Sequence, residues 1–182
     1  MGRADLLPRH ADAGRLTVRQ IDPAELSPGE FAHTLKASVE EHGVRLVIID
    51  SLNGYFNAMP NERFLMLHMH ELLMYLNQQG VLTLMTLAQH GVLAQMQSPV
   101  DVSHLADNVI LLRYFEAQGE LKQAISVIKN RDSSHERTIR EFQITPTGIR
   151  IGQPLRQFRG VLSGVPVYSG KEKLLDSDDN AE

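Results

Sequence analysis

Residues 27–50 combine a helical apolar pattern with a short, continuously apolar run. Ser27 and Glu30 form a capping-box pattern at the start of the segment, and Gly43 suits the left-handed conformation that ends many helices. The sequence therefore predicts a helix between Ser27 and Gly43. Residues 44–50 follow at once, and their four consecutive apolar β-formers predict a strand that is buried on both faces, as in a parallel sheet.

The same succession of helix, glycine and strand occurs again directly afterwards. Residues 61–79 are rich in Leu and Met and predict a long helix, which Gly80 closes. Residues 81–86 predict a second buried strand, and the alternating residues 15–21 predict a shorter strand ahead of the first helix. This repetition predicts βαβ connections and a mostly parallel sheet of the α/β class.

The pattern changes after His104, where short strands follow one another without helices. We expect strands at residues 108–114, 121–128, 141–144 and 149–151. Because the connections between them are short, these strands are predicted to pair antiparallel, as additions at the far edge of the parallel sheet.

These patterns predict one α/β domain at residues 15–155. An irregular segment, residues 1–14, precedes it, and a C-terminal extension, residues 156–182, follows it. The length of 182 residues suits one domain, and 42% apolar with 22% charged residues is typical of a soluble globular protein. From Gly170 onward the chain is polar and acidic, so we expect a mobile tail.

Composition narrows the classes of function. The chain has no cysteine, which excludes disulfides and cysteine-based metal sites and fits a cytoplasmic protein. A net charge of -4 argues against nucleic-acid binding. No apolar run approaches the roughly 18 residues of a membrane span, and residues 1–14 lack the apolar core of a signal peptide, so neither feature is expected.

Asp50 ends the first apolar run and is followed by Ser51. A buried strand holds its terminal carboxylate rigidly at the carboxyl edge of a parallel sheet, where ligands of α/β folds bind. A carboxylate in this position can hold Mg²⁺, usually through water. The alternative interpretation is that Asp50 only caps the turn that follows the strand.

Two further sets of residues follow strands. Thr86 ends the second apolar run, where its hydroxyl can contact a γ-phosphate or a water, or can bond to local backbone instead. Lys129 and Arg131 lie two apart on an extended segment, so their side chains point the same way. A guanidinium there suits bidentate contact with phosphate, and the alternative is a solvated strand edge.

Together these segments resemble the KaiC family, the RecA-like ATPases named for the cyanobacterial clock protein. The resemblance covers roughly residues 14–168, and its most specific parts are residues 106–113, ADNVILLR, and residues 129–135, KNRDSSH. It implies a RecA-like P-loop NTPase core that binds nucleotide between the subunits of a ring, usually a hexamer. Mg²⁺ and ATP are then the expected cofactors, and further copies of the chain, with a signalling protein as a second possibility, are the expected partners.

The matched motifs imply a role for each candidate residue. Asp50 is the expected magnesium residue, with Ser51 and Thr86 beside the nucleotide. Lys129 and Arg131 are expected to reach the phosphates of a nucleotide on the neighbouring subunit, where an arginine finger can contribute about 10³–10⁵ in rate. The residues expected along the same nucleotide are Ser133, Ser134 and His135.

The sequence departs from this family at its start. The chain contains no GxxxxGK[ST] motif, and the family's phosphate-binding loop and its strand with a glutamate pair should precede residue 14. We expect either a fragment of a longer protein or a degenerate relative, catalytically incompetent alone. An apolar strand edge would then lack its neighbour, so we expect self-association or a further segment to cover it.

Two other functions stay open on the sequence. A non-enzymatic interaction module of the same family would keep a ring-type interface without hydrolysis. A fragment of a RecA- or RadA-type recombinase ranks lowest, because residues 91–103, where such proteins place DNA-binding loops, contain no Lys or Arg.

Overall fold

The computed structural model describes residues 10–11, 13–22, 25–57, 62–88, 104–162 and 166–168. The chain forms two compact units, Met1–Ala88 and Gln89–Glu182. The loop predicted at residues 91–103 and the tail predicted from Gly170 lie outside the described residues. Among the helices that the structure describes, none has the length and apolar character needed to cross a bilayer.

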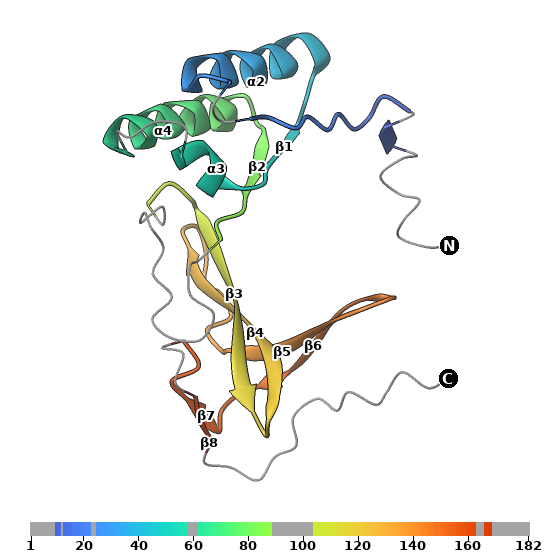
Figure 1. Ribbon diagram of the computed structural model, residues 1–182, viewed down its shortest axis with the longest axis vertical. Coiled ribbons are helices and arrows are strands. Elements are labelled where there is room, and N and C mark those ends of the chain that lie inside the picture. The colour runs from blue at the N-terminus through green and yellow to red at the C-terminus, as the bar shows by residue number, and fades with distance from the viewer. Residues whose placement is uncertain are drawn as a thin grey trace. The chain divides into compact units, whose positions relative to one another are not determined.

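The first unit alternates helices and parallel strands, as the sequence predicts. Its elements in chain order are α2 (Pro28–His42), β1 (Leu46–Ile49), α3 (Leu52–Asn57), α4 (Glu62–Gln78) and β2 (Leu82–Met85). The two strands pair in parallel, with Leu46 opposite Leu82 and Ile49 opposite Met85. In Figure 1, α2 and α4 lie side by side, and α4 also packs against β2. The α/β class is therefore confirmed.

Local sequence signals account for the bounds of α2. The Ser27 side chain accepts a hydrogen bond from the Glu30 N–H at 3.2 Å, and the Glu30 carboxylate accepts one from the Ser27 N–H at 2.9 Å. The hydrogen bonds from Ser27 lower the pKa of Glu30. At the other end, Gly43 adopts φ 65°, a left-handed conformation that glycine reaches without steric cost. The capping box and the terminating glycine are confirmed.

Contacts between α2 and α4 are partly apolar and partly polar. The Tyr75 hydroxyl donates a 2.6 Å hydrogen bond to Glu40, and this carboxylate raises the pKa of Tyr75. The Lys36 ammonium lies 5.0 Å from the centre of the Tyr75 ring, within the range of a cation–π contact. The buried face of α4 is formed by Leu65, Met69, Leu72 and Leu76.

The prediction that β1 is buried on both faces is wrong. Val47 is buried, but Leu46 and Ile48 are 50% and 60% exposed. Their partners on β2, Leu82 opposite Leu46 and Leu84 opposite Ile48, are exposed as well. The helices of this unit cover one side of a two-stranded sheet, so a continuous apolar run leaves its alternate residues on the open side.

The strand predicted at residues 15–21 is also absent. Residues 16–22 have no regular secondary structure, and Val18 is 78% exposed. A short alternating segment forms a strand only when a neighbouring strand supplies hydrogen-bond partners, and the pattern of residues 15–21 alone does not provide them. The sequence patterns also did not predict the short helix α3, because Gly54 interrupts its pattern.

The second unit contains a four-stranded antiparallel sheet in the order β3 (Asn108–Ala117), β4 (Glu120–Asn130), β5 (Arg140–Thr145), β6 (Gly148–Pro154). The two longest strands, β3 and β4, form a hairpin that is visible in Figure 1. A further pair, β7 (Phe158–Arg159) and β8 (Val167–Tyr168), is also antiparallel. All four antiparallel strands predicted from the sequence are confirmed. In the described residues, however, they pair with one another in a sheet separate from β1 and β2, and so they do not extend the parallel sheet as predicted.

One face of β3 and β4 carries the core of this unit. Phe115 is almost fully buried, and its ring meets that of Phe158 edge to face at 5.5 Å between centroids. Leu155 and Val161 belong to the same cluster, with Ala117 and Ala124 from the hairpin. Residues on both sides of the predicted boundary at 155 thus share one core, and that boundary stays a prediction.

Candidate nucleotide-binding residues

The carboxyl ends of β1 and β2 bring Asp50 and Thr86 together. The Thr86 hydroxyl donates a 2.5 Å hydrogen bond to Asp50 Oδ1. The backbone continues the ladder at this point, because the Thr86 N–H donates to the Ile49 carbonyl at 3.0 Å. Both Asp50 and Thr86 are solvent-exposed. Asp50 therefore lies at the rim of a parallel pair, where ligands of α/β folds bind, and its role stays a prediction.

The start of α3 fixes the segment around this pair. The Leu52 N–H donates to the Thr86 carbonyl at 2.9 Å. The Asn53 side chain binds the backbone of Ala88 twice, accepting from its N–H at 2.8 Å and donating to its carbonyl at 3.0 Å. Ser51 is half-buried between β1 and α3, and the peptide bond joining it to Asp50 is cis. Asn53 was not singled out from the sequence, because its contact with Ala88 spans 35 positions.

The donor set at this edge fits Mg²⁺ shared with a nucleotide. One carboxylate and one hydroxyl supply the hard oxygen ligands that Mg²⁺ prefers. Among the residues that the structure describes, no group of three His, Cys, Asp or Glu side chains is placed to hold a metal ion. Asp50 would therefore hold Mg²⁺ together with ligands from outside the protein, as is usual for Mg²⁺ in phosphoryl-transfer sites.

Lys129 and Arg131 lie at the end of β4 and contact the same short segment. The Lys129 ammonium donates to the Ala106 carbonyl at 2.9 Å. The Arg131 guanidinium pairs with the Asp107 carboxylate at 2.8 Å, and the Arg131 N–H donates to the Asp107 carbonyl at 3.0 Å. The two cations therefore contact two consecutive residues, Ala106 and Asp107.

The residues after Arg131 form a loop held by its own polar side chains. The side-chain NH₂ group of Asn130 donates to the Ser133 hydroxyl at 3.1 Å, and the side-chain oxygen of Asn130 accepts from the Asp132 N–H at 3.2 Å. Ser133 and Ser134 are exposed and His135 is half-buried. Both serines of this loop are therefore accessible, and the Ser133 hydroxyl is also bound to Asn130.

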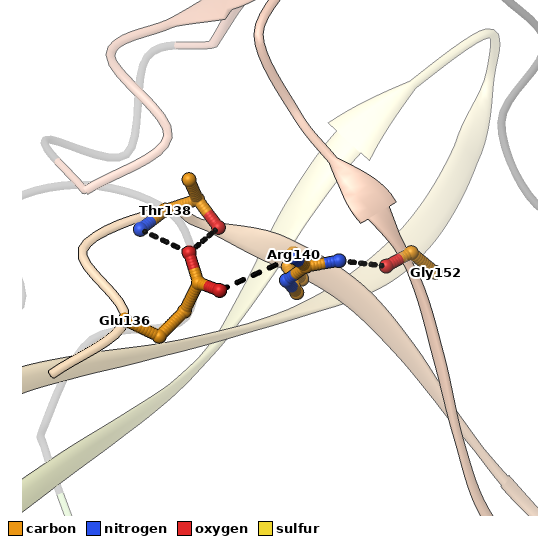
Figure 2. Close-up of polar contacts among 4 residues, drawn as sticks. All are labelled: Glu136, Thr138, Arg140 and Gly152. Atoms are coloured by element: carbon orange, nitrogen blue, oxygen red, sulfur yellow. Dashed lines mark hydrogen bonds and ion pairs between the residues drawn. The ribbon is translucent and has the colours of Figure 1, made fainter.

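A second group of polar contacts holds the far end of this loop, as Figure 2 shows. Glu136 accepts from the Thr138 hydroxyl at 2.6 Å and from the Thr138 N–H at 3.2 Å. Arg140 donates to Glu136 at 3.2 Å and to the Gly152 carbonyl at 3.1 Å, which connects the loop to β6. The Thr138 hydroxyl, the Thr138 amide and then Arg140 lower the pKa of Glu136.

The predicted site residues therefore fall into two groups, one in each unit. Asp50, Ser51 and Thr86 lie together in the first unit. In the second unit, the segment from Lys129 to His135 is continuous. Sequence reasoning missed Asp107, although the hairpin pairs Asn108 with Asn130 and so places the preceding residue beside the end of β4. The roles of all these residues stay predictions.

Comparison with protein families finds one described as “ATPase: KaiC”, whose model matches residues 11–156. The circadian clock protein KaiC3 of Synechocystis sp. is 42% identical over 73 residues, which is 40% of this chain and 14% of that protein. The circadian clock oscillator protein KaiC of Synechococcus elongatus is 30% identical over 133 residues, 72% of this chain and 25% of that protein.

Longer matches confirm the same likeness at lower identity. The KaiC of Acaryochloris marina is 27% identical over 164 residues, 90% of this chain and 31% of that protein. The chain therefore spans less than a third of the curated relatives it matches. Among solved structures, a KaiC-like protein from Pyrococcus horikoshii OT3 superposes with a TM-score of 0.66, covering 80% of this chain and 64% of that one at 21% identity. This likeness establishes a RecA-like fold.

Proposed function

Because the chain belongs to the KaiC family of ATPases, we propose that it contributes a magnesium residue and two phosphate-binding cations to a nucleotide site of the ring type. Asp50 holds Mg²⁺, with Ser51 and Thr86 beside the nucleotide. Lys129 and Arg131 act on the phosphates of a nucleotide carried by a neighbouring subunit. Asp50 would hold Mg²⁺ there, and the ion would supply positive charge that offsets the charge of the phosphates.

The single observation that carries this proposal is the position of Asp50. Its carboxylate lies at the carboxyl end of β1, fixed by the Thr86 hydroxyl at 2.5 Å and by the parallel pairing of β1 with β2. A carboxylate held by both neighbouring strands needs little rearrangement to meet a metal ion. A merely structural cap would need the local N–H contacts of a turn, whereas the contact observed for Asp50 is with a side chain 36 positions away.

The arrangement of the cations supports the second part of the proposal. Arg131 keeps 57% of its side chain exposed while one N–H pairs with Asp107. An arginine carries five N–H donors in a planar fork that matches phosphate. Ser133, Ser134 and His135 continue the same surface and complete the set of proposed nucleotide contacts.

We expect the 182-residue chain alone to bind magnesium ATP weakly and not to hydrolyse it. Its sequence has no GxxxxGK[ST] motif, so it has neither the backbone cradle nor the lysine that hold the β- and γ-phosphates. The nucleotide on which Lys129 and Arg131 act would then be carried by a neighbouring subunit that has this motif, such as an intact family member. Further copies of this chain would join the oligomer without supplying the motif.

The open side of the first unit supports association with another polypeptide. Four large apolar side chains lie exposed on neighbouring positions of β1 and β2, and contiguous exposed apolar surface is typical of protein contacts. Light scattering on the purified chain tests this part. An oligomer is expected, and a stable monomer at high dilution would contradict it.

Calorimetric titration of the chain with magnesium ATP tests the nucleotide site. We expect weak binding of magnesium ATP. Asp50→Asn should weaken this binding further in the presence of Mg²⁺, whereas Lys129→Ala and Arg131→Ala should weaken it with or without Mg²⁺. Glu136→Gln, which removes an exposed carboxylate outside the proposed site, is the control. Absence of any binding heat would favour the non-enzymatic interaction module instead.

A further inference from the structure

We infer that Asp107 is a positioning residue for the two cations, and that it acts by holding Arg131 where a phosphate can meet it. This inference rests on the proposed function of Arg131. Asp107 is not expected to touch the nucleotide, so it is distinct from the residues that bind phosphate. It lies directly before β3, opposite the end of β4.

Three contacts connect the cations with two consecutive residues. Lys129 donates to the Ala106 carbonyl at 2.9 Å, the Arg131 guanidinium pairs with the Asp107 carboxylate at 2.8 Å, and the Arg131 N–H donates to the Asp107 carbonyl at 3.0 Å. The backbone contact continues the hairpin pairing of Asn108 with Asn130. One segment therefore fixes the backbone of Arg131 and the side chains of both cations.

Such fixation matters because a free arginine loses much rotamer entropy when it binds phosphate. Ordering a long side chain costs conformational entropy, and a contact already present in the unbound protein reduces that cost. Asp107 orders the guanidinium through a charge-assisted hydrogen bond. Lys129 is also restrained from the same segment, because its ammonium donates to the Ala106 carbonyl.

The geometry favours positioning over masking. The contact between Asp107 and Arg131 joins Oδ1 to Nη1, and the side chains stay 42% and 57% exposed. Most of the arginine fork is thus left for an anion. If Asp107 instead masked Arg131, it would compete with phosphate, and removing its carboxylate would strengthen nucleotide binding. The two hypotheses predict opposite signs for the same substitution.

The chain offers a matched control for this test. Glu120 pairs with Lys122 at 3.0 Å at the other end of the hairpin of β3 and β4, and its side chain is 56% exposed. Asp107→Ala and Glu120→Ala each remove one exposed carboxylate from a cation and change the net charge equally. Asp107→Asn keeps an oxygen acceptor and serves as the conservative variant. Arg131→Ala provides the background that lacks the guanidinium which Asp107 is inferred to position.

The experiment measures two quantities on the full 182-residue chain. The first is the NMR signal of the Arg131 guanidinium, whose rotation is slowed by pairing. The second is the affinity for magnesium ATP, from chemical-shift titration at low salt. We expect Asp107→Ala to speed the rotation and to weaken binding about threefold, the effect of losing a typical exposed ion pair. Asp107→Asn should retain most of the affinity, and Glu120→Ala should change neither quantity.

The outcomes separate this inference from the proposed function. If Arg131→Ala leaves the affinity for magnesium ATP unchanged, the proposed function of Arg131 fails. If Arg131→Ala weakens binding but Asp107→Ala strengthens it or leaves it unchanged, positioning by Asp107 is refuted. The same conclusion holds if Asp107→Ala weakens binding equally in the Arg131→Ala background, because its effect would then bypass the arginine.

Discussion

The Thr86 hydroxyl donates a 2.5 Å hydrogen bond to Asp50 Oδ1 and so joins the ends of two parallel strands. These two side chains are 36 positions apart in the sequence, yet each directly follows its strand. The contact holds the carboxylate at the rim of the sheet pair. It also makes Thr86 a structural partner of the residue proposed to bind Mg²⁺.

Two threonines, Thr83 within β2 and Thr86 directly after it, should respond in opposite directions to the same substitution. Thr83 has a buried hydroxyl without a hydrogen-bond partner, whereas the Thr86 hydroxyl binds Asp50. Thr83→Val removes an unsatisfied polar atom and should stabilise the unit by about 1 kcal/mol, and Thr86→Val should destabilise it by a similar amount. Urea unfolding measures both, and equal signs would contradict the described geometry.

Helix α4 offers a comparison between a buried and an exposed leucine. Leu76 is fully buried and Leu67 is 56% exposed. Leu76→Ala leaves a cavity and should lower the free energy of unfolding by about 2–5 kcal/mol. Leu67→Ala should change it by less than about 0.5 kcal/mol. Thermal unfolding followed by circular dichroism tests the difference, and comparable losses would show that this face of α4 is misassigned.

The N-terminus of α2 depends on one side chain. Ser27→Ala removes the acceptor for the Glu30 N–H and should lower the free energy of unfolding by about 1 kcal/mol. Ser27→Asp keeps an acceptor at the cap and is the control. Chemical denaturation of both variants checks this prediction, and an equal loss in the two would exclude a capping role.

Glu136 should make stability depend on pH in a defined window. Its pKa is lowered from the ordinary 4.5 by Thr138 and Arg140, so the folded state favours the ionised form. This stabilisation is complete above pH 4.5 and is lost as the pH falls through the lowered folded-state pKa. Glu136→Gln should therefore be less stable than wild type at neutral pH, with the difference vanishing in acid. A difference that persists in acid would show that charge is not its cause.

Local signals predicted most of the secondary structure. The capping box at Ser27 and the glycine at Gly43 define α2 because they satisfy backbone groups within the helix itself. The antiparallel strands were predicted because their partners lie nearby in the sequence. Such contacts join residues that lie close together in the sequence, so a local pattern is enough to predict them.

Tertiary context decided the features that the sequence did not predict. Residues 46–49 are uniformly apolar, and nothing local shows that Leu46 and Ile48 face an open side. Residues 15–21 have the alternation of a strand, but strand formation depends on a partner elsewhere. In the candidate site, the strand-end position of Asp50 was predictable from its apolar run. The position of Asp107 beside Arg131 was not predictable, because it depends on the register of the hairpin of β3 and β4.

Paramagnetic broadening by manganese ATP tests the central claim most directly. Mn²⁺ occupies magnesium sites and broadens the NMR signals of residues close to it. We predict that the amides of Asp50, Ser51 and Thr86 broaden at the lowest additions of manganese ATP, and that Asp50→Asn abolishes this effect. Broadening that begins elsewhere in the chain, or that survives Asp50→Asn, would contradict the assignment of Asp50 as the metal residue.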